Sequence, residues 1–290
     1  MYAKVRDTEL FFDIEGAGLV PEGSRMRERP TAFLVHGGPG VDHSGLKARY
    51  GKLAEKMQLV YFDHRGQGRS RGDPKTYTLD ENIEDMEALR QSLGLGPIVS
   101  IGTSYGGTVA LAHAARYPAS VSHLILVAAV CHAGYIQRAK ELVAERGTAE
   151  QVKYCEDLFA GRIDTEGKMR AYFLAMGDLY ARVADPALSE IGLRRAILSP
   201  EALNRAHGPE GILRNYDLRP ELGRVTAPTL ILAGRYDWIC PPEFSEEMAR
   251  LMPDADLRIF EYSAHSIAGD EPERFLDAVA GFVVYKNRRV

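Results

Sequence analysis

Short apolar runs of strand length alternate with stretches of helical periodicity through the first half of this 290-residue chain. An alternation of this kind is typical of a parallel sheet whose faces are covered by helices. Because the runs are almost continuously apolar, we expect strands that are buried on both faces. The expected strands are 31–35, 59–62, 98–101 and 124–127, and the expected helices are 46–57, 79–93 and 104–117. The sequence therefore predicts an α/β fold with a mostly parallel sheet.

The two ends of the chain extend the same pattern. Residues 2–6 and 10–15 are interpreted as an opening hairpin and residues 16–30 as a loop. In the last quarter we expect strands at 229–233 and 257–260 and helices at 242–252 and 272–284. The sheet is therefore expected to resume after an interruption in the middle of the chain.

The interruption covers residues 132–215, where helical periodicity continues without a convincing strand. We interpret this segment as a helical cap inserted into one α/β core domain, which is formed by residues 1–131 and 216–290. Two independent domains are the alternative, and it is disfavoured because neither flank holds a complete sheet. The expected cap helices are 136–145, 149–159, 168–181 and 188–198.

The charge balance and the apolar runs argue against two classes of partner. With 36 Lys and Arg against 40 Asp and Glu, the net charge is −4, so there is no basic surplus to neutralise nucleic-acid phosphates. The longest apolar run, Leu124 to Cys131, is shorter than the ~18 residues of a spanning helix, and the N-terminus lacks a signal-peptide pattern. We therefore expect no nucleic-acid partner, no membrane association and a cytoplasmic protein.

The cysteine and histidine spacings argue against a metal site. Cys131, Cys155 and Cys240 stand far apart without a CxxC spacing, which favours reduced thiols over a disulfide framework or a zinc site. No pair of histidines has the spacing of metal ligands. We therefore expect no metal and no cofactor.

A candidate nucleophile lies in the segment Gly102-Thr103-Ser104-Tyr105-Gly106, which matches the pattern G-x-S-x-G between an expected strand and an expected helix. In that context the glycines allow a sharp, strained turn that presents the serine hydroxyl at the N-terminus of the helix. The sequence therefore predicts that Ser104 is a catalytic nucleophile.

A serine nucleophile needs a base to take its proton and a carboxylate to orient that base. In this architecture the chain order is Ser, then Asp or Glu, then His. Asp237 follows the expected strand 229–233, and His265 follows the expected strand 257–260. Because the carboxyl ends of parallel strands meet at one edge of the sheet, we predict that Ser104, Asp237 and His265 form a triad.

Acyl transfer also needs backbone N–H donors aimed at the developing oxyanion. The segment His36-Gly37-Gly38-Pro39-Gly40 directly follows the expected strand 31–35. One donor in such folds comes from this loop, and the other is the residue after the nucleophile. We therefore predict an oxyanion hole formed by the N–H groups of Gly38 and Tyr105.

Four segments together resemble the proline iminopeptidases, which are α/β-hydrolase serine peptidases that remove an N-terminal proline or other residue. The segments are His36-Gly37-Gly38-Pro39-Gly40, Asp63-His64-Arg65-Gly66-Gln67-Gly68-Arg69-Ser70, Gly102-Thr103-Ser104-Tyr105-Gly106-Gly107 and Gly234-Arg235-Tyr236-Asp237. The resemblance covers nearly the whole chain and is weakest in the expected cap. It implies an α/β-hydrolase fold, and it implies that residues 63–70 form a structural loop beside the site.

The resemblance also bears on the substrate. In that family the free α-amino group of the substrate is held by carboxylates from the cap and, in some members, from the residue after the triad Asp. Here Trp238 stands at the second position and suggests an apolar wall instead. In the cap, His207-Gly208-Pro209-Glu210 is similar to a Gly-Pro-x-Glu stretch that supplies such a carboxylate, so the resemblance makes Glu210 a candidate.

We therefore expect a serine hydrolase that acts on a small molecule or a short peptide through an acyl-enzyme. The resemblance implies cleavage of an amide or peptide bond with removal of an N-terminal residue. A carboxylesterase or lactonase acting on small apolar esters shares the same motifs and is the alternative. A ligand-binding protein that keeps the pocket but not turnover is a second alternative, against which the apparently intact triad argues. Nothing in the sequence specifies an oligomeric state.

Overall fold

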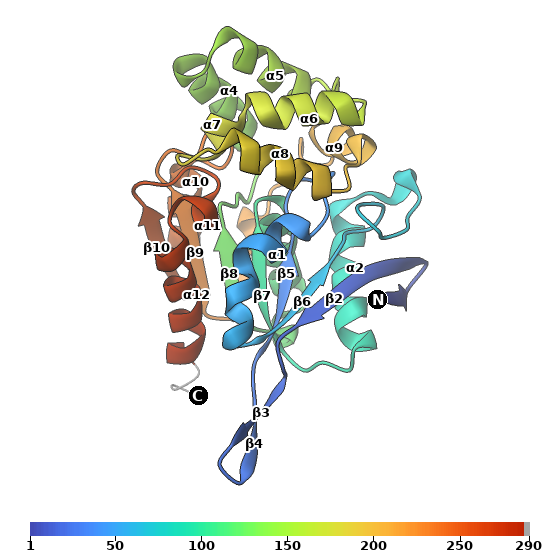
Figure 1. Cartoon of the computed structure of the whole chain (residues 1–290), viewed down its shortest axis with the longest axis vertical. Coiled ribbons are helices and arrows are strands. Elements are labelled where there is room, and N and C mark those ends of the chain that lie inside the picture. The colour runs from blue at the N-terminus through green and yellow to red at the C-terminus, as the bar shows by residue number, and fades with distance from the viewer. Residues whose placement is uncertain (287–290) are drawn as a thin grey trace.

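The computed structural model describes residues 1–286, with side chains described through residue 283. Within these residues, one eight-stranded sheet is covered by helices on both faces, and a further layer of helices lies over one end of the sheet (Figure 1). The α/β-hydrolase architecture predicted from the sequence is confirmed. No helix in this part of the chain is both long enough and apolar enough to cross a bilayer.

The large sheet has the strand order β1-β2-β6-β5-β7-β8-β9-β10. Strand β2 runs antiparallel to β1 and to β6, whereas all other neighbours are parallel. The strands are β1 (Tyr2–Val5), β2 (Thr8–Glu15), β5 (Thr31–Val35), β6 (Gln58–Phe62), β7 (Ile98–Thr103), β8 (Val121–Val127), β9 (Thr229–Gly234) and β10 (Ala255–Phe260). The opening hairpin and the parallel strands that the sequence predicted are therefore present.

The two faces of the sheet carry separate apolar cores, because successive side chains of a strand point to opposite faces. Ala32 and Leu34 of β5 pack on one face, and Phe33 and Val35 pack on the other. The first face is covered by α1 (Ser44–Tyr50), η1 (Gly51–Glu55), α11 (Ile267–Asp270) and α12 (Pro272–Lys286). The second is covered by α2 (Leu79–Ser92), α3 (Tyr105–Arg116) and α10 (Pro242–Leu251).

The upper layer of helices comes from the chain between β8 and β9 (Figure 1). It consists of α4 (Tyr135–Arg146), α5 (Ala149–Phe159), α6 (Glu166–Ala175), α7 (Gly177–Tyr180), α8 (Pro186–Arg195) and α9 (Pro200–His207). All of these helices except α8 contribute to a third apolar core, which also includes Trp238 and Phe244 from beyond β9. We propose that residues 132–215 form the cap and that the flanking segments form the core domain. The last four residues of the predicted core segment, 287–290, lie outside the described residues.

Residues 16–30 were predicted as a loop, and this prediction is wrong. They form a second hairpin of β3 (Leu19–Glu22) and β4 (Arg25–Glu28), which projects from the bottom of the molecule in Figure 1. Nearly all its side chains are exposed, so no burial pattern marks the strands in the sequence. Its strands are joined at Gly23, whose φ of 63° lies in the left-handed region that favours glycine.

Three predicted helices also differ from the structure. The stretch 46–57 becomes α1 and the short 3₁₀ helix η1, and the stretch 168–181 is divided at Met176 into α6 and α7. The stretch 188–198 ends as α8 at Arg195, and the separate helix α9 was not predicted. Short helices leave too few turns for periodicity to define their ends.

Candidate active site

Ser104 occupies the turn between β7 and α3, as the G-x-S-x-G pattern predicts. Its φ and ψ angles are 55° and −124°, a conformation that is strained for any residue with a side chain. The turn is held because the Ser104 N–H donates to the Val127 carbonyl at 2.9 Å and its carbonyl accepts from the Gly107 N–H at 2.8 Å. Hydrogen bonds of both the N–H and the carbonyl of Ser104 therefore maintain the strained conformation.

The second glycine of the pattern is required by close packing. A Cβ on Gly106 would lie 2.0 Å from the Val35 carbonyl oxygen, so the first turn of α3 can approach β5 only without a side chain at this position. This approach places Ser104 beside the loop that follows β5. A Cβ on Gly37 in that loop would lie 2.9 Å from the Cβ of Ser104.

Asp237 and His265 form a hydrogen-bonded pair at the ends of β9 and β10. The Nδ1 atom of His265 donates to Oδ2 of Asp237 at 2.8 Å. The other carboxylate oxygen accepts from the N–H groups of Ile239 and Cys240 at 3.0 and 2.9 Å, and the carboxylate is fully buried. A proton on Nδ1 leaves Nε2 of the neutral imidazole as an acceptor, which is the state that a general base needs.

Cys240 shows how Ser104 lies relative to this pair. Its thiol contacts the Ser104 hydroxyl, and its sulfur, a His265 ring nitrogen and an Asp237 oxygen all lie within 4.8 Å of one another. The three residues predicted as a triad therefore converge at one edge of the sheet. Burial raises the pKa of the Cys240 thiol well above its usual value, so the thiol is protonated at neutral pH and does not compete as a nucleophile.

The position of Cys240 was missed from the sequence, although it lies only three residues after Asp237. Cys240, Asp237 and His265 also form a donor set of the types that zinc prefers. In this structure the imidazole and the carboxylate already bond to each other. A second acidic cluster, at Asp7, Glu81 and Asp85, surrounds the guanidinium of Arg65, which supplies the positive charge there.

The predicted oxyanion donors both border Ser104. Tyr105 is the first residue of α3, and first-turn N–H groups have no acceptor within their own helix. Gly38 follows Gly37, which packs against the Cβ of Ser104. The arrangement is compatible with an anion bound between the loop after β5 and the N-terminus of α3.

An aromatic wall from the cap covers the histidine. The ring of Tyr180 lies 5.4 Å from the imidazole of His265 and 5.5 Å from the indole of Trp238, edge-on to both. The Tyr180 carbonyl accepts from the Ser266 N–H at 2.8 Å, which anchors the end of α7 beside the triad. Trp238 is only 1% exposed, and its indole packs against the Tyr180 ring. The sequence predicted Trp238 as an apolar wall but gave no signal for Tyr180.

Glu210 lies away from the triad. It is exposed and lines an open groove of about 740 Å³ between the cap and the core segment 74–78, together with Lys75, Glu201 and Arg205. No triad residue lines this groove. In the stretch that Glu210 resembles, one residue separates the proline from the glutamate, whereas Glu210 follows Pro209 directly. The structure therefore does not bring Glu210 together with the other predicted site residues.

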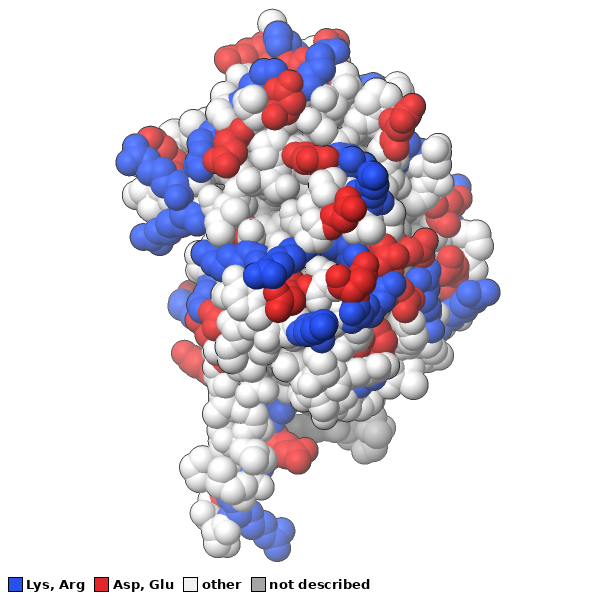
Figure 2. Space-filling model, turned by 90° about the vertical axis from the view of Figure 1, so that its right-hand side faces the viewer, with Lys and Arg blue, Asp and Glu red and all other residues white. Residues whose placement is uncertain are grey.

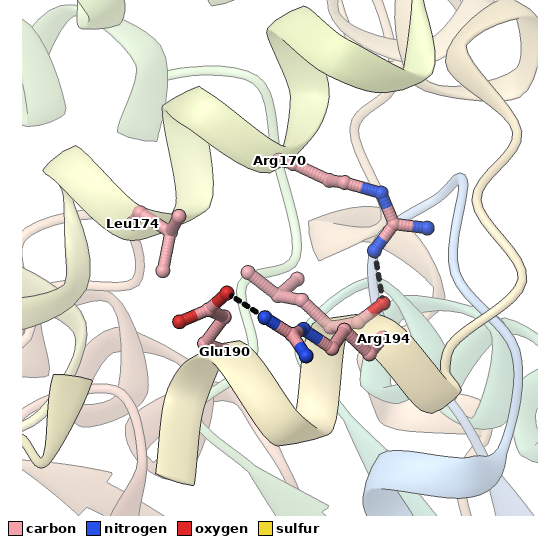
Figure 3. A pocket seen from close by; sticks show the side chains of 5 residues that line it. Arg170, Leu174, Glu190 and Arg194 are labelled. Carbon is pink, nitrogen blue, oxygen red and sulfur yellow. Dashed lines mark hydrogen bonds and ion pairs between the residues drawn. The ribbon is translucent and has the colours of Figure 1, made fainter. Parts of the chain in front are cut away.

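Figure 2 shows acidic and basic side chains intermixed over one side of the molecule. A smaller cavity of about 250 Å³ lies between α6 and α8, where Arg194 pairs with Glu190 and Arg170 donates to the Leu193 carbonyl (Figure 3). Its charged groups bond to protein partners, and it shares no residue with the triad.

Comparisons with known proteins show the family of the chain. The model of the α/β hydrolase fold family matches residues 30–272. The chain is 28% identical to proline iminopeptidase PfmaB of Pestalotiopsis fici over 264 residues, covering 89% of this chain and 92% of that one. It is 29% identical to the proline iminopeptidase of Saccharolobus solfataricus over 275 residues, covering 86% and 83% of the two chains.

Among solved structures, the crystal structure of proline iminopeptidase from Mycobacterium smegmatis has a TM-score of 0.78 and 22% identity, and covers 98% of this chain and 97% of that one. At this identity the likeness shows the fold alone. The resemblance to proline iminopeptidases stated from the motifs is confirmed by the sequence relatives that bear that name.

Proposed function

The chain belongs to the α/β-hydrolase fold family, and from that premise we propose that it is a serine hydrolase of the proline iminopeptidase type. It would remove an N-terminal residue from short peptides or aminoacyl amides. Small molecules or short peptides are the proposed substrates, with no nucleic acid or membrane as partner. A cytoplasmic location is part of the proposal and fits three buried cysteines that are all free thiols.

One observation carries the proposal, namely the His265–Asp237 hydrogen bond beside a serine held in a strained turn. A buried carboxylate bonded to an imidazole is costly unless its partners satisfy it, and here two backbone N–H groups and the imidazole do so. Such a pair keeps the Nδ1 proton in place and stabilises the imidazolium that forms during reaction.

The proposed reaction follows from these positions. Nε2 of His265 takes the proton of the Ser104 hydroxyl as the oxygen attacks the substrate carbonyl. The N–H groups of Gly38 and Tyr105 stabilise the oxyanion, and His265 then returns the proton to the leaving amine. Water attacks the resulting ester of Ser104 by the same route and releases the N-terminal residue as the free acid.

The test is a panel of chromogenic substrates with varied acyl groups, each supplied as the p-nitroanilide and as the p-nitrophenyl ester. Aminoacyl p-nitroanilides with a free amino group, proline included, are compared with their N-acetylated forms and with simple acyl derivatives. The proposal predicts turnover that requires the free amine. Turnover of acyl esters alone would contradict the peptidase assignment while leaving the serine hydrolase chemistry intact.

A carboxylesterase is the second candidate, and it is favoured by the lack of a partner for an ammonium. Among the described residues, the buried acidic side chains other than Asp237 are Asp42, Asp63, Asp85 and Glu87. All four bond to groups of the core, such as His43, Arg65 or His113. An ammonium buried without a partner costs several kcal/mol, so a substrate with a neutral acyl group would suit this site better.

A further inference from the structure

Residues 63–70 form a motif that the proposed mechanism does not use, yet they contact the loop after β5 along its length. The N–H of His64 donates to Nε2 of His36 at 3.1 Å, at the start of that loop. The N–H of His43, at its end, donates to Oδ1 of Asp63 at 2.9 Å. Residues 36–43, which we call the oxyanion loop, are therefore held at both ends by residues 63–64.

The charge states of these contacts fit their hydrogen-bonding roles. Burial lowers the pKa of His36, so the imidazole is neutral and Nε2 accepts while Nδ1 bonds to the Gly37 carbonyl at 2.8 Å. Burial opposes ionisation of Asp63, but hydrogen bonds from His43 and from the Arg69 N–H hold its pKa below the usual value. The buried polar groups at both ends of the oxyanion loop therefore have hydrogen-bond partners.

The middle of the oxyanion loop is held by Gln67. Its Oε1 accepts from the Gly40 N–H at 2.6 Å, and the Gln67 side chain is almost completely buried. The Gly40 carbonyl accepts in turn from the N–H of Ser199, the residue before α9, at 2.8 Å. The backbone N–H of Gly40 is therefore bonded to the core, and its carbonyl is bonded to the cap.

Gly40 packs so closely against the cap that only glycine fits at this position. Its φ is +103°, and a Cβ there would lie 2.8 Å from the Ser199 carbonyl oxygen and 3.1 Å from Leu203 and from Met169. The helix α9 reaches the loop a second time, where Nε2 of His207 lies 3.5 Å from the Gly38 carbonyl oxygen. Gly38 is only two residues from Gly40, so displacement of Gly40 changes the direction of the Gly38 N–H.

We propose that Gln67 is a positioning residue, which fixes Gly40 against α9 and thereby aims the Gly38 N–H at the oxyanion. The inference rests on the proposed function, because it assigns a role only if Gly38 is an oxyanion donor. Oxyanion donors act in the transition state and depend strongly on geometry, so a misplaced donor lowers kcat more than it changes KM. If Gln67 were only structural, its replacement would instead lower the melting temperature without lowering kcat selectively.

The test compares substitutions that keep or remove the acceptor. Gln67→Glu retains an oxygen that accepts the Gly40 N–H, whereas Gln67→Met has a similar shape without one. Gln67→Asn keeps the amide, but its side chain is one methylene too short to reach the Gly40 N–H. It replaces the Met variant in the test if that variant does not fold. Gln151→Met is the matched control, because Gln151 is also buried and its Oε1 accepts the Thr148 N–H at 2.8 Å, but it lies in the cap helix α5.

The readouts are kcat, KM, the melting temperature and the inhibition constant of a trifluoromethyl ketone, whose adduct with serine places an oxyanion in the hole. We expect Gln67→Met and Gln67→Asn to lower kcat by about 10- to 100-fold with KM changed less than about threefold. The ketone should bind correspondingly more weakly. Gln67→Glu should recover most of kcat, and Gln151→Met should lower the melting temperature without changing kcat.

The outcomes separate the inference from the proposed function. If the wild type turns over substrate through Ser104 and Gln67→Met keeps its kcat and ketone affinity, the positioning role is wrong and the proposed function stands. If Gln67→Met and Gln151→Met lose stability and activity in parallel, the role is also overturned. A wild type without serine-dependent turnover would instead contradict the proposed function itself, and the ketone would then show no tight binding to any variant.

Discussion

The core and the cap meet at His265, but they contribute to the site in different ways. The core holds Ser104 and Asp237 by backbone hydrogen bonds at the ends of strands. The cap reaches the site through Tyr180 and His207, and burial keeps both uncharged by raising the pKa of Tyr180 well above its usual value and lowering that of His207 to about 4. From this comparison we propose that the core supplies the chemistry, whereas the cap supplies shape and apolar contact for the substrate.

The largest expected effect tests the core side of this comparison. Ser104→Ala removes the attacking oxygen and should lower kcat by on the order of 10⁶, leaving only catalysis from binding and the oxyanion donors. Its melting temperature should change little, because the side-chain contact of the hydroxyl is with the Cys240 thiol, which is a weak hydrogen-bonding group. The measurement is steady-state kinetics beside thermal unfolding.

The matched control for this prediction is Ser100→Ala. Ser100 is a fully buried serine of β7, the strand that precedes Ser104, and its hydroxyl has no hydrogen-bond partner among the described residues. It should retain wild-type kcat. A Ser104→Ala enzyme within tenfold of the wild type would remove Ser104 from the mechanism.

The next effect tests the cap side and concerns substrate choice. Tyr180→Ala removes the ring between His265 and Trp238 and should raise KM for small acyl groups by about tenfold, since the wall that contacts them is lost. Larger acyl groups should be accepted better than by the wild type. Tyr180→Phe keeps the ring and loses only the hydroxyl contact with Tyr172, so it is the control and should change KM little. A uniform fall in kcat for every acyl group would show that Tyr180 serves the chemistry instead.

The core side of the proposed site could be inferred from the sequence because each of its three residues follows the end of a strand within five residues. The strand pattern is a local property of the sequence, and it was enough to predict that Ser104, Asp237 and His265 lie close together. Gln67 and Tyr180 could not be found in this way, since their contacts with Gly40 and His265 join parts of the chain that periodicity does not relate. Glu210 was inferred from a short motif in the cap, which carries no information on the direction of the chain after Pro209, and the structure places it in the open groove.

A smaller effect concerns acid stability and involves the cap residue His207. Burial lowers its pKa in the folded state to about 4, below the reference value of about 6.5 for an exposed histidine. Between these values the unfolded chain binds a proton that the folded chain does not, so stability falls as the pH decreases from about 6.5 to about 4. His207→Gln should reduce this loss, by at most about 1.4 kcal/mol per pH unit.

The measurement is the melting temperature of both proteins at several pH values in that range. Buried His36 and His64 of the core have lowered pKa values too, so part of the acid sensitivity should remain in the variant. Gln151→Met, which changes a buried cap side chain that does not titrate, is the control and should keep the wild-type slope. An unchanged slope in His207→Gln would show that His207 is not held neutral by the cap.

The smallest expected effect concerns Glu210, on the outer surface of the cap. Because Glu210 lines the open groove rather than the triad, Glu210→Gln should change kcat and KM less than twofold for aminoacyl and simple acyl substrates alike. Parallel kinetics with both substrate types provide the check. A rise in KM confined to aminoacyl substrates would mean that the carboxylate meets the substrate ammonium after all, and that the cap supplies charge as well as shape.

The central claim is that the core presents one activated serine, and covalent labelling tests it most directly. The wild type is labelled with a near-stoichiometric amount of a fluorophosphonate and then digested. The position of the adduct is mapped by mass spectrometry. The account predicts a single adduct on Ser104, formed faster than in an Asp237→Asn variant because that variant lacks the carboxylate that orients His265. An adduct on Cys240 or on any other residue, or no adduct in an enzyme that turns over substrate, would contradict it.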